Sequence, residues 1–147
     1  MTINTEKIQA IDLARKKVIT CSLNQTIPDV ARLMKENWIS SVIVVEQDRP
    51  VGIITDGIIF DLIANKRNPL TLLVKDIMVT VFTIHKATNI NDSEDQFLKT
   101  KVKRLAVVDD DGHLVGVLSK KVIDRYTHYS LAQRILHQKK YEPQHRG

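Results

Sequence analysis

The sequence predicts an α/β fold made of two copies of one strand-and-helix unit. In residues 42–56, apolar β-branched runs flank the polar turn 46–50, which contains a proline. This pattern indicates a β-hairpin, because such runs favour buried strands and a proline cannot continue a strand ladder. The same arrangement returns in residues 105–120, where Gly116 follows Gly52 by 64 positions. The two copies account for most of the chain.

Length and composition fit one compact soluble domain. A chain of 147 residues that is 43% hydrophobic buries enough surface to fold without a disulfide or a metal. Cys21 is the only cysteine, and no apolar stretch near the N-terminus is long enough for a signal peptide or a membrane span. We therefore expect a cytoplasmic protein without a membrane partner.

The charge balance favours anionic partners. The formal net charge is +5 and the pI is about 9.4, but aromatic residues make up only 5% of the chain. So few aromatic side chains give little platform for stacking nucleobases. A nucleic-acid partner is therefore disfavoured, although charge alone would permit it.

The first copy is expected to follow a short lead-in. Apolar residues spaced through residues 2–16 predict an amphipathic helix that ends near a basic run. Residues 18–21 predict a short strand, and residues 24–26 offer a cap for a helix that ends near Asn37. After the hairpin, residues 57–65 predict a second helix.

The second copy repeats this order. After a connection, residues 74–78 resemble residues 11–14, residues 81–84 predict a strand, and a helix begins near Asn89. A last helix is expected from Lys120 to about Tyr126, then a segment capped by Ser130 and a polar tail from Gln138. The predicted divisions are a lead-in helix (1–17), two repeat domains (18–66 and 67–128), and a C-terminal helix with a tail (129–147).

The duplicated order of strand, helix, strand, strand and helix resembles the CBS (cystathionine-β-synthase) domain pair, or Bateman module. In each copy the third strand closes with Gly-x-x-Thr or Gly-x-x-Ser, at Gly52 to Thr55 and at Gly116 to Ser119. The resemblance covers residues 11 to about 126. The segments that carry it are residues 26–34, 39–45, 52–56, 102–109 and 116–119.

The resemblance implies tandem CBS domains related by a pseudo-twofold axis, with two clefts between them. In many members these clefts bind adenosine-containing ligands such as AMP, ATP or S-adenosylmethionine. It implies a non-catalytic regulatory module that needs no cofactor, stands alone in its chain, and signals to a partner protein that the sequence does not identify. We also expect a homodimer, paired through helices of both copies that carry Val30, Met34, Phe97 and Leu98.

Carrying the family pattern over residue by residue predicts two ligand-binding clefts, each built from both copies. For the cleft at the end of the second copy's third strand, the Ser119 cleft, the predicted residues are Val117, Ser119, Lys120, Lys121 and Arg104 with Gln25, Thr26, Val30, Ile39, Ser40 and Ser41. For its mirror, the Thr55 cleft, they are Ile53, Thr55 and Asp56 with Ala87, Thr88, Ser93, Val102 and Lys103.

Two features separate this chain from the family pattern and the clefts from each other. Nucleotide-binding members usually carry an Asp three residues after the Ser or Thr, where it bonds the ribose hydroxyls; here Ile58 and Val122 occupy those positions. Lys120 and Lys121 follow Ser119, whereas the acidic Asp56 follows Thr55, so the Ser119 cleft is the predicted phosphate binder. The alternative is that these lysines are only the solvated first turn of a helix.

Other chemistries lack a matching pattern of residues. The five histidines have no metal-ligand spacing, Cys21 has no partner that would activate it, and residues 109–112 read as a solvated turn. Trp38 is expected at a packing or dimer face. Two further functions stay open: a ligand-independent dimerisation module with degenerate clefts, favoured by Ile58 and Val122, and a nucleic-acid-associated protein, favoured only by charge.

Overall fold

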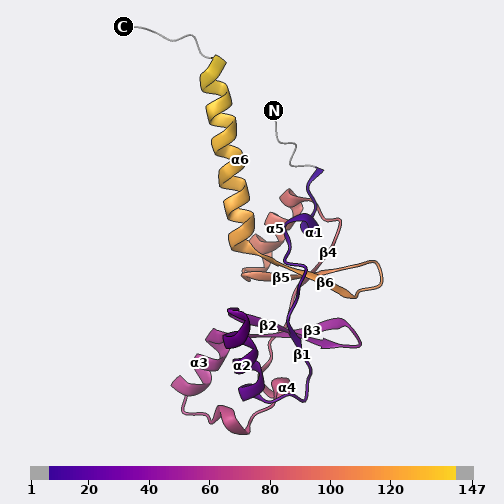
Figure 1. Ribbon diagram of the computed structural model, residues 1–147, viewed down its shortest axis with the longest axis vertical. Coiled ribbons are helices and arrows are strands. Elements are labelled where there is room, and N and C mark those ends of the chain that lie inside the picture. The colour runs from indigo at the N-terminus through magenta and orange to yellow at the C-terminus, as the bar shows by residue number, and fades with distance from the viewer. Residues whose placement is uncertain (1–6, 142–147) are drawn as a thin grey trace.

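The computed structural model describes residues 7–141, which form two halves stacked along the long axis of the molecule (Figure 1). Each half contains a three-stranded sheet in which the outer strand pairs parallel with the middle strand and a hairpin supplies the third. The strands of the first half are β1 (Thr20–Cys21), β2 (Ser41–Glu46) and β3 (Arg49–Thr55). Those of the second half are β4 (Thr83–His85), β5 (Arg104–Val108) and β6 (Leu114–Ser119).

Helices cover each sheet. The first half carries α2 (Ile27–Asn37), α3 (Asp56–Ala64), the 3-10 turn η2 (Pro69–Thr71) and α4 (Val74–Ile77). The second half carries α1 (Ala10–Leu13), α5 (Ile90–Thr100) and α6 (Lys120–Tyr141). The predicted duplicated α/β architecture is confirmed. No helix within residues 7–141 is long and apolar enough to cross a membrane.

Local sequence sets the ends of the main helices. The Thr26 hydroxyl accepts a hydrogen bond from the Asp29 N–H (3.2 Å), and the Asp29 carboxylate accepts one from the Thr26 N–H, so the two residues cap α2 reciprocally. At α5 the Asn89 side chain accepts from the Asp92 N–H at 2.8 Å, and its amide donates to the Asp92 carboxylate at 3.1 Å. Helix α2 ends at Trp38, whose backbone lies in the left-handed region at φ 54°.

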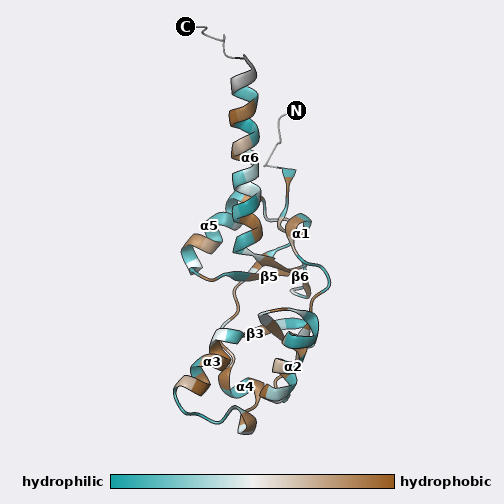
Figure 2. Ribbon diagram, turned by 60° about the vertical axis from the view of Figure 1, so that its left-hand side comes forward, coloured by the Kyte–Doolittle hydropathy of each residue, from teal (hydrophilic) through white to brown (hydrophobic). Residues whose placement is uncertain are grey.

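Each half has its own apolar core. The short helix that leads into the first half, α1, packs in the core of the second half, and α4, which leads into the second half, packs in the core of the first. Ala10 of α1 is buried with Phe97 in the second core, and Val74 of α4 is buried with Val30 in the first. Brown, hydrophobic residues recur along α3 and α4, which close the lower half in Figure 2. The two halves are therefore interlocked by the chain segments that connect them.

The repeated glycines lie where these connecting segments cross the third strands. A Cβ on Gly116 would lie 3.0 Å from the Cβ of Ala14, and one on Gly52 would lie 2.6 Å from the Met78 sulfur. At these crossings, isolated β-bridges pair Arg15 with Val117 in β6 and Val79 with Ile53 in β3. The glycine repeat seen in the sequence thus marks close approach of two chain segments.

The first hairpin is tighter than predicted. Its turn contains only Gln47 and Asp48, both with positive φ (51° and 61°), rather than the five residues 46–50. Pro50 lies inside β3, opposite Val45, where the strand register shifts. Such an irregularity tolerates a residue without an N–H, so the proline does not end the strand.

Several predicted boundaries were wrong. The lead-in helix is limited to α1 in the described residues, because Ala14 is extended and Arg15 pairs with β6; residues 2–6 lie outside them. The strands expected at 18–21 and 81–84 are β1 and β4, which are shorter or shifted. Helix α6 runs unbroken to Tyr141, since no glycine or proline interrupts it, and residues 142–147 of the predicted tail lie outside the description. The predicted domain divisions stay a prediction.

The predicted dimer face was also mostly wrong in its residues. Val30, Met34 and Phe97 are buried within the cores of their own halves, and of the four residues named only Leu98 is exposed. The helical spacing was correct, but it described core-facing positions. Trp38 does not pack in a core either, because it is 94% exposed.

Candidate ligand-binding cavities

Two cavities lie where the strand ends of the two halves meet. They share two lining residues that are hydrogen-bonded to each other. Arg104, the first residue of β5, donates from Nη2 to the hydroxyl of Ser40, just before β2, at 3.1 Å. Both residues line both cavities. The positions are equivalent in the two repeats, so a cation on one copy meets a hydroxyl on the other.

The Ser119 cavity has a volume of about 380 Å³. Its walls come from the segment between α1 and β1, the entry to β2, and the end of β6. The residues that line it are Leu13, Ala14, Arg15, Lys17, Val18, Ile19, Trp38, Ile39, Ser40, Ser41, Ile43, Arg104, Val117, Ser119 and Val122.

The Ser119 cavity differs from the Thr55 cavity because its lining contains basic residues but no acidic ones. Arg15, Lys17 and Arg104 line it, and none of its lining residues is Asp or Glu. Apolar side chains such as Ile39 and Val117 form the rest of the wall, and the exposed Trp38 stands at its solvent edge. This combination suits a ligand with an apolar ring at one end and negative charge at the other.

The Thr55 cavity is larger, about 510 Å³, and its charge is mixed. Asp56 lies in it together with Lys103 and Arg104, and the Asp56 carboxylate accepts a hydrogen bond from the Gly57 N–H at 2.8 Å. The residues that line it are Ser40, Ser41, Ile53, Thr55, Asp56, Gly57, Val79, Thr80, Val81, Phe82, Val102, Lys103 and Arg104.

The hydroxyls that name the cavities cap the helices that follow them. Ser119 accepts from the Val122 N–H of α6, and Thr55 accepts from the Ile58 N–H of α3, each at 3.2 Å. Accepting a bond leaves the hydroxyl proton for donation, so each side chain can cap its helix and bind an anion at once.

The structure places part of each predicted set at its cavity. Of the Ser119 set, Ile39, Ser40, Ser41, Arg104, Val117 and Ser119 are in place, and of the Thr55 set, Ile53, Thr55, Asp56, Val102 and Lys103 are in place. These residues stay predictions as ligand contacts.

The other predicted residues of the Ser119 set do not line the Ser119 cavity. Val30 is fully buried in the first core, Thr26 caps α2, and the Gln25 side chain accepts from the Ser22 N–H. Lys120 forms an ion pair with Asp124 at 2.8 Å, and Lys121 is exposed outside the lining.

The residues of the Thr55 set that lie at the start of α5 do not line the Thr55 cavity either. Ser93 donates to the Asn89 carbonyl, the Thr88 carbonyl accepts from the Ala10 N–H, and the Ala87 N–H donates to the ring of His85. The helix starts are covered by α1 and α4 through bridges at Asn89 and Thr26, so they cannot face the cavities.

Sequence reasoning missed the segments that connect the halves. Arg15, Lys17 and their apolar neighbours up to Ile19 line one cavity, and residues 79–82 line the other. The signal was present in the basic run at residues 15–17, which we interpreted only as the end of a helix. The 64-residue repeat, extended back from the strands, would have pointed to both segments.

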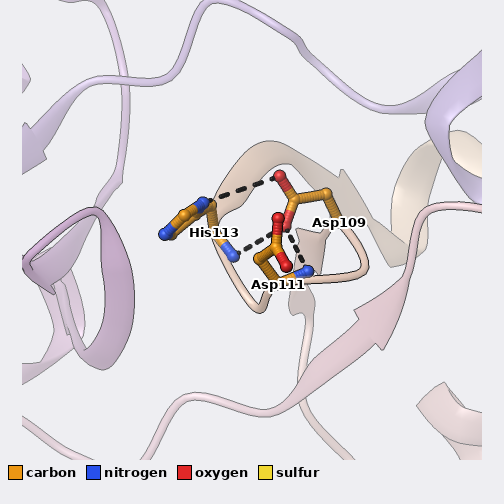
Figure 3. A group of neighbouring side chains, drawn as sticks. All are labelled: Asp109, Asp111 and His113. Atoms are coloured by element: carbon orange, nitrogen blue, oxygen red, sulfur yellow. Dashed lines mark hydrogen bonds and ion pairs between the residues drawn. The ribbon is translucent and has the colours of Figure 1, made fainter.

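A compact group of Asp109, Asp111 and His113 lies in the second hairpin turn (Figure 3). One Asp109 oxygen accepts from the N–H groups of both Asp111 and His113 at 2.9 Å, and these backbone bonds, that from His113 first, lower the pKa of Asp109. Backbone hydrogen bonds within the turn therefore hold Asp109 beside Asp111 and His113.

Cys21 lies in the first core. Burial raises the pKa of its thiol to about 11, so the reactive thiolate form is disfavoured at neutral pH. This agrees with its prediction as a core residue.

Comparisons with known proteins agree with this geometry. The model of the CBS domain matches residues 10–65 and 74–128. The uncharacterized protein MK0525 of Methanopyrus kandleri is 32% identical over 124 residues, which cover 82% of this chain and 63% of that protein. The chain therefore spans less than two thirds of the length of this relative.

Two solved structures share the fold. CBSX2 of Arabidopsis thaliana in complex with AMP superposes with a TM-score of 0.70 at 25% identity, covering 82% of this chain and 96% of that one. The CBS domain pair of protein MJ0100, in complex with 5-methylthioadenosine and S-adenosyl-L-methionine, gives a TM-score of 0.73 at 24% identity, covering 82% and 96%.

Proposed function

The chain belongs to the CBS domain family, and we propose that it is a regulatory module that binds an adenine nucleotide in the Ser119 cavity and signals to a partner protein. The observation that carries this proposal is the lining of that cavity: three cations, a helix-capping hydroxyl and apolar walls, with no acid among them. The AMP held by CBSX2 supports an adenosine-containing ligand for the family fold.

The chemistry of the lining matches the two ends of a nucleotide. The Ser119 hydroxyl and the Arg104 guanidinium lie at the strand ends, where they would bind phosphate, and Arg is suited to this because its planar donors match phosphate oxygens. Ile39, Val117 and Ile19 offer apolar surface for an adenine ring.

We assign phosphate binding to the Ser119 cavity before the Thr55 cavity, as expected from the sequence, but for a different reason. The lysines that follow Ser119 do not line the cavity; Arg15 and Lys17 supply the positive charge instead. In the Thr55 cavity the Asp56 carboxylate would oppose a phosphate.

The nearest competing function is a structural module that binds no ligand. It is favoured by Ile58 and Val122, which stand where a ribose-binding carboxylate is expected, and Val122 lines the Ser119 cavity. Under this alternative the open cavity would be a relic of the duplication.

A homodimer is part of the proposal. Phe60 and Ile63 on α3 and Leu98 on α5 are exposed apolar side chains that a second copy could cover. A monomer mass by light scattering at micromolar concentration would contradict this part of the proposal.

The protein would pass on the ligand-bound state to its partner without catalysing a reaction.

A fluorescence titration tests the proposal, because Trp38 is the only tryptophan in the chain and lines the Ser119 cavity but not the Thr55 cavity. AMP, ATP and S-adenosylmethionine would be titrated while tryptophan emission and the melting temperature are recorded. We expect saturable quenching and a raised melting temperature for at least one nucleotide. Neither change with any of the three ligands would favour the structural module.

A further inference from the structure

We propose that the Ser119 cavity selects nucleoside polyphosphates over monophosphates and does not distinguish ribose from deoxyribose. This inference rests on the proposed function and names the ligand class of the same site. It follows from three properties of the lining: three unneutralised cations, the lack of a carboxylate, and an exposed aromatic side chain at the edge.

The cations face the cavity from different parts of the chain. Arg15 and Lys17 come from the segment between α1 and β1, and Arg104 comes from β5. Within residues 7–141, none of the three forms an ion pair with a carboxylate. Their charge is therefore available to a ligand rather than used within the fold.

An anion with more negative charge gains more from the three cations. The hydrogen bond to Ser40 orients Arg104, and backbone bonds with Val117 of β6 anchor Arg15. A single phosphate adds about two negative charges at one point. A chain of two or three phosphates carries more negative charge, so it gains more from the three cations than a single phosphate does.

The charge of the lining also disfavours cationic ligands. S-adenosylmethionine carries a sulfonium cation, and none of the lining residues supplies a carboxylate to balance it. Three cations around the cavity would repel that ligand. A sulfonium ligand should therefore bind more weakly than any nucleotide of the same base.

The sugar has no strong partner in the cavity. A ribose hydroxyl is held most firmly by a carboxylate acceptor, but Ser40, Ser41 and Ser119 are the only side chains of the lining with an acceptor oxygen. Ser119 and Ser40 already accept bonds, from α6 and from Arg104. Removing the 2′-hydroxyl should therefore cost little affinity.

Trp38 adds an aromatic surface for the base beside the apolar side chains of the wall. It stands at the cavity edge, 94% exposed, with its backbone in the left-handed region, which bulky residues seldom adopt. A flat indole in this place can stack on a purine whatever sugar it carries. The same residue reports binding in this cavity.

The experiment compares AMP, ADP, ATP, dATP and S-adenosylmethionine without divalent metal at one ionic strength, with Trp38 emission as the readout. We expect ATP to bind at least about tenfold more tightly than AMP, ADP to lie between them, and dATP to stay within about twofold of ATP. S-adenosylmethionine should bind most weakly. The preference for ATP should shrink as salt is added.

Variants link the preference to the named side chains. Arg15→Gln combined with Lys17→Gln should bring ATP to within about threefold of AMP, whereas Lys35→Gln, an exposed lysine on α2 outside the cavity, should leave the ratio unchanged. Melting curves verify that each variant folds. Binding of AMP as tight as that of ATP in the wild type overturns the polyphosphate preference, and a dATP affinity tenfold below ATP overturns the sugar inference. If no nucleotide binds at all, the proposed function fails with it.

Discussion

The two cavities occupy equivalent positions in a duplicated fold, yet their linings have diverged in charge. At positions 64 residues apart, Arg15 corresponds to Val79 and Lys17 to Val81, and each of these four residues lines its own cavity. The strand ends are less different, since Ser40 and Arg104 are shared. The charge difference therefore comes from the connecting segments and from Asp56, which follows β3.

The largest expected effect comes from erasing this difference. Arg15→Val with Lys17→Val would give the Ser119 cavity the side chains of its counterpart. We expect ATP affinity to fall by about 100-fold, because two charge-assisted contacts are lost. Isothermal titration calorimetry would measure it.

The reciprocal variant, Val79→Arg with Val81→Lys, serves as the control for that change. It should leave the tryptophan-reported affinity of the Ser119 cavity within about twofold, because those residues line only the Thr55 cavity. Equal losses from both double variants would contradict separate roles for the two cavities.

Adding a sugar partner should sharpen the comparison. Val122→Asp introduces a carboxylate into the Ser119 cavity, in the first turn of α6, where the helix dipole also favours it. AMP binding should tighten by about tenfold, and ATP should then be preferred to dATP.

The matched change for Val122→Asp is Ile58→Asp, which places the same group at the equivalent position in the first turn of α3, where Ile58 packs against the first core and lines neither cavity. It should not alter the tryptophan signal. If a well-folded Val122→Asp variant gains nothing, the cavity is closed to nucleotides and the structural module becomes the better account.

A smaller effect is expected from substituting the two glycines at the crossings, which should lower the stability of the fold by different amounts. Gly116→Ala should lower the free energy of unfolding by about 1–3 kcal/mol, because the added methyl group meets Ala14 and the Arg15 carbonyl, which are short or rigid. Gly52→Ala meets chiefly the flexible side chain of Met78, so it should cost less. Urea denaturation measures both, and a larger loss at Gly52 would be the contrary result.

The two hairpin turns differ in their dependence on pH, and this effect should be the smallest. The second turn is held by Asp109, whose pKa is lowered by backbone N–H donors, while Gln47 and Asp48 make the first turn by conformation. The carboxylate of Asp109 therefore stabilises the fold above its unfolded pKa of about 3.9, and this stabilisation is lost as the pH falls through its lower folded value.

Asp109→Asn isolates that contribution. The variant should be slightly less stable than the wild type at pH 7, and the difference should shrink below about pH 3.9 as the wild-type carboxylate takes up its proton. Thermal melts at several pH values would detect it. A difference that does not change with pH would assign the role of Asp109 to shape alone.

The sequence predicted the duplication, the hairpins, a cap within residues 24–26 and a helix start near Asn89, because these depend on residues close together in the chain. The resemblance to the CBS family placed Ser119, Arg104 and Ser40 at the cavities, and the structure has all three in the lining.

It could not place Gln25, Thr88 or Val30 correctly. What covers a helix start depends on where a distant segment packs, and α1 and α4 each pack on the opposite half. For the same reason Arg15 and Lys17 were missed: their neighbours in space are a strand end about 100 residues away.

A crystal structure of the protein with ATP would test the central claim most directly. We predict one nucleotide per chain, in the Ser119 cavity, with its phosphates among Arg15, Lys17 and Arg104 and its base against Trp38. Electron density for the nucleotide in the Thr55 cavity, or phosphates that contact none of these cations, would contradict the account.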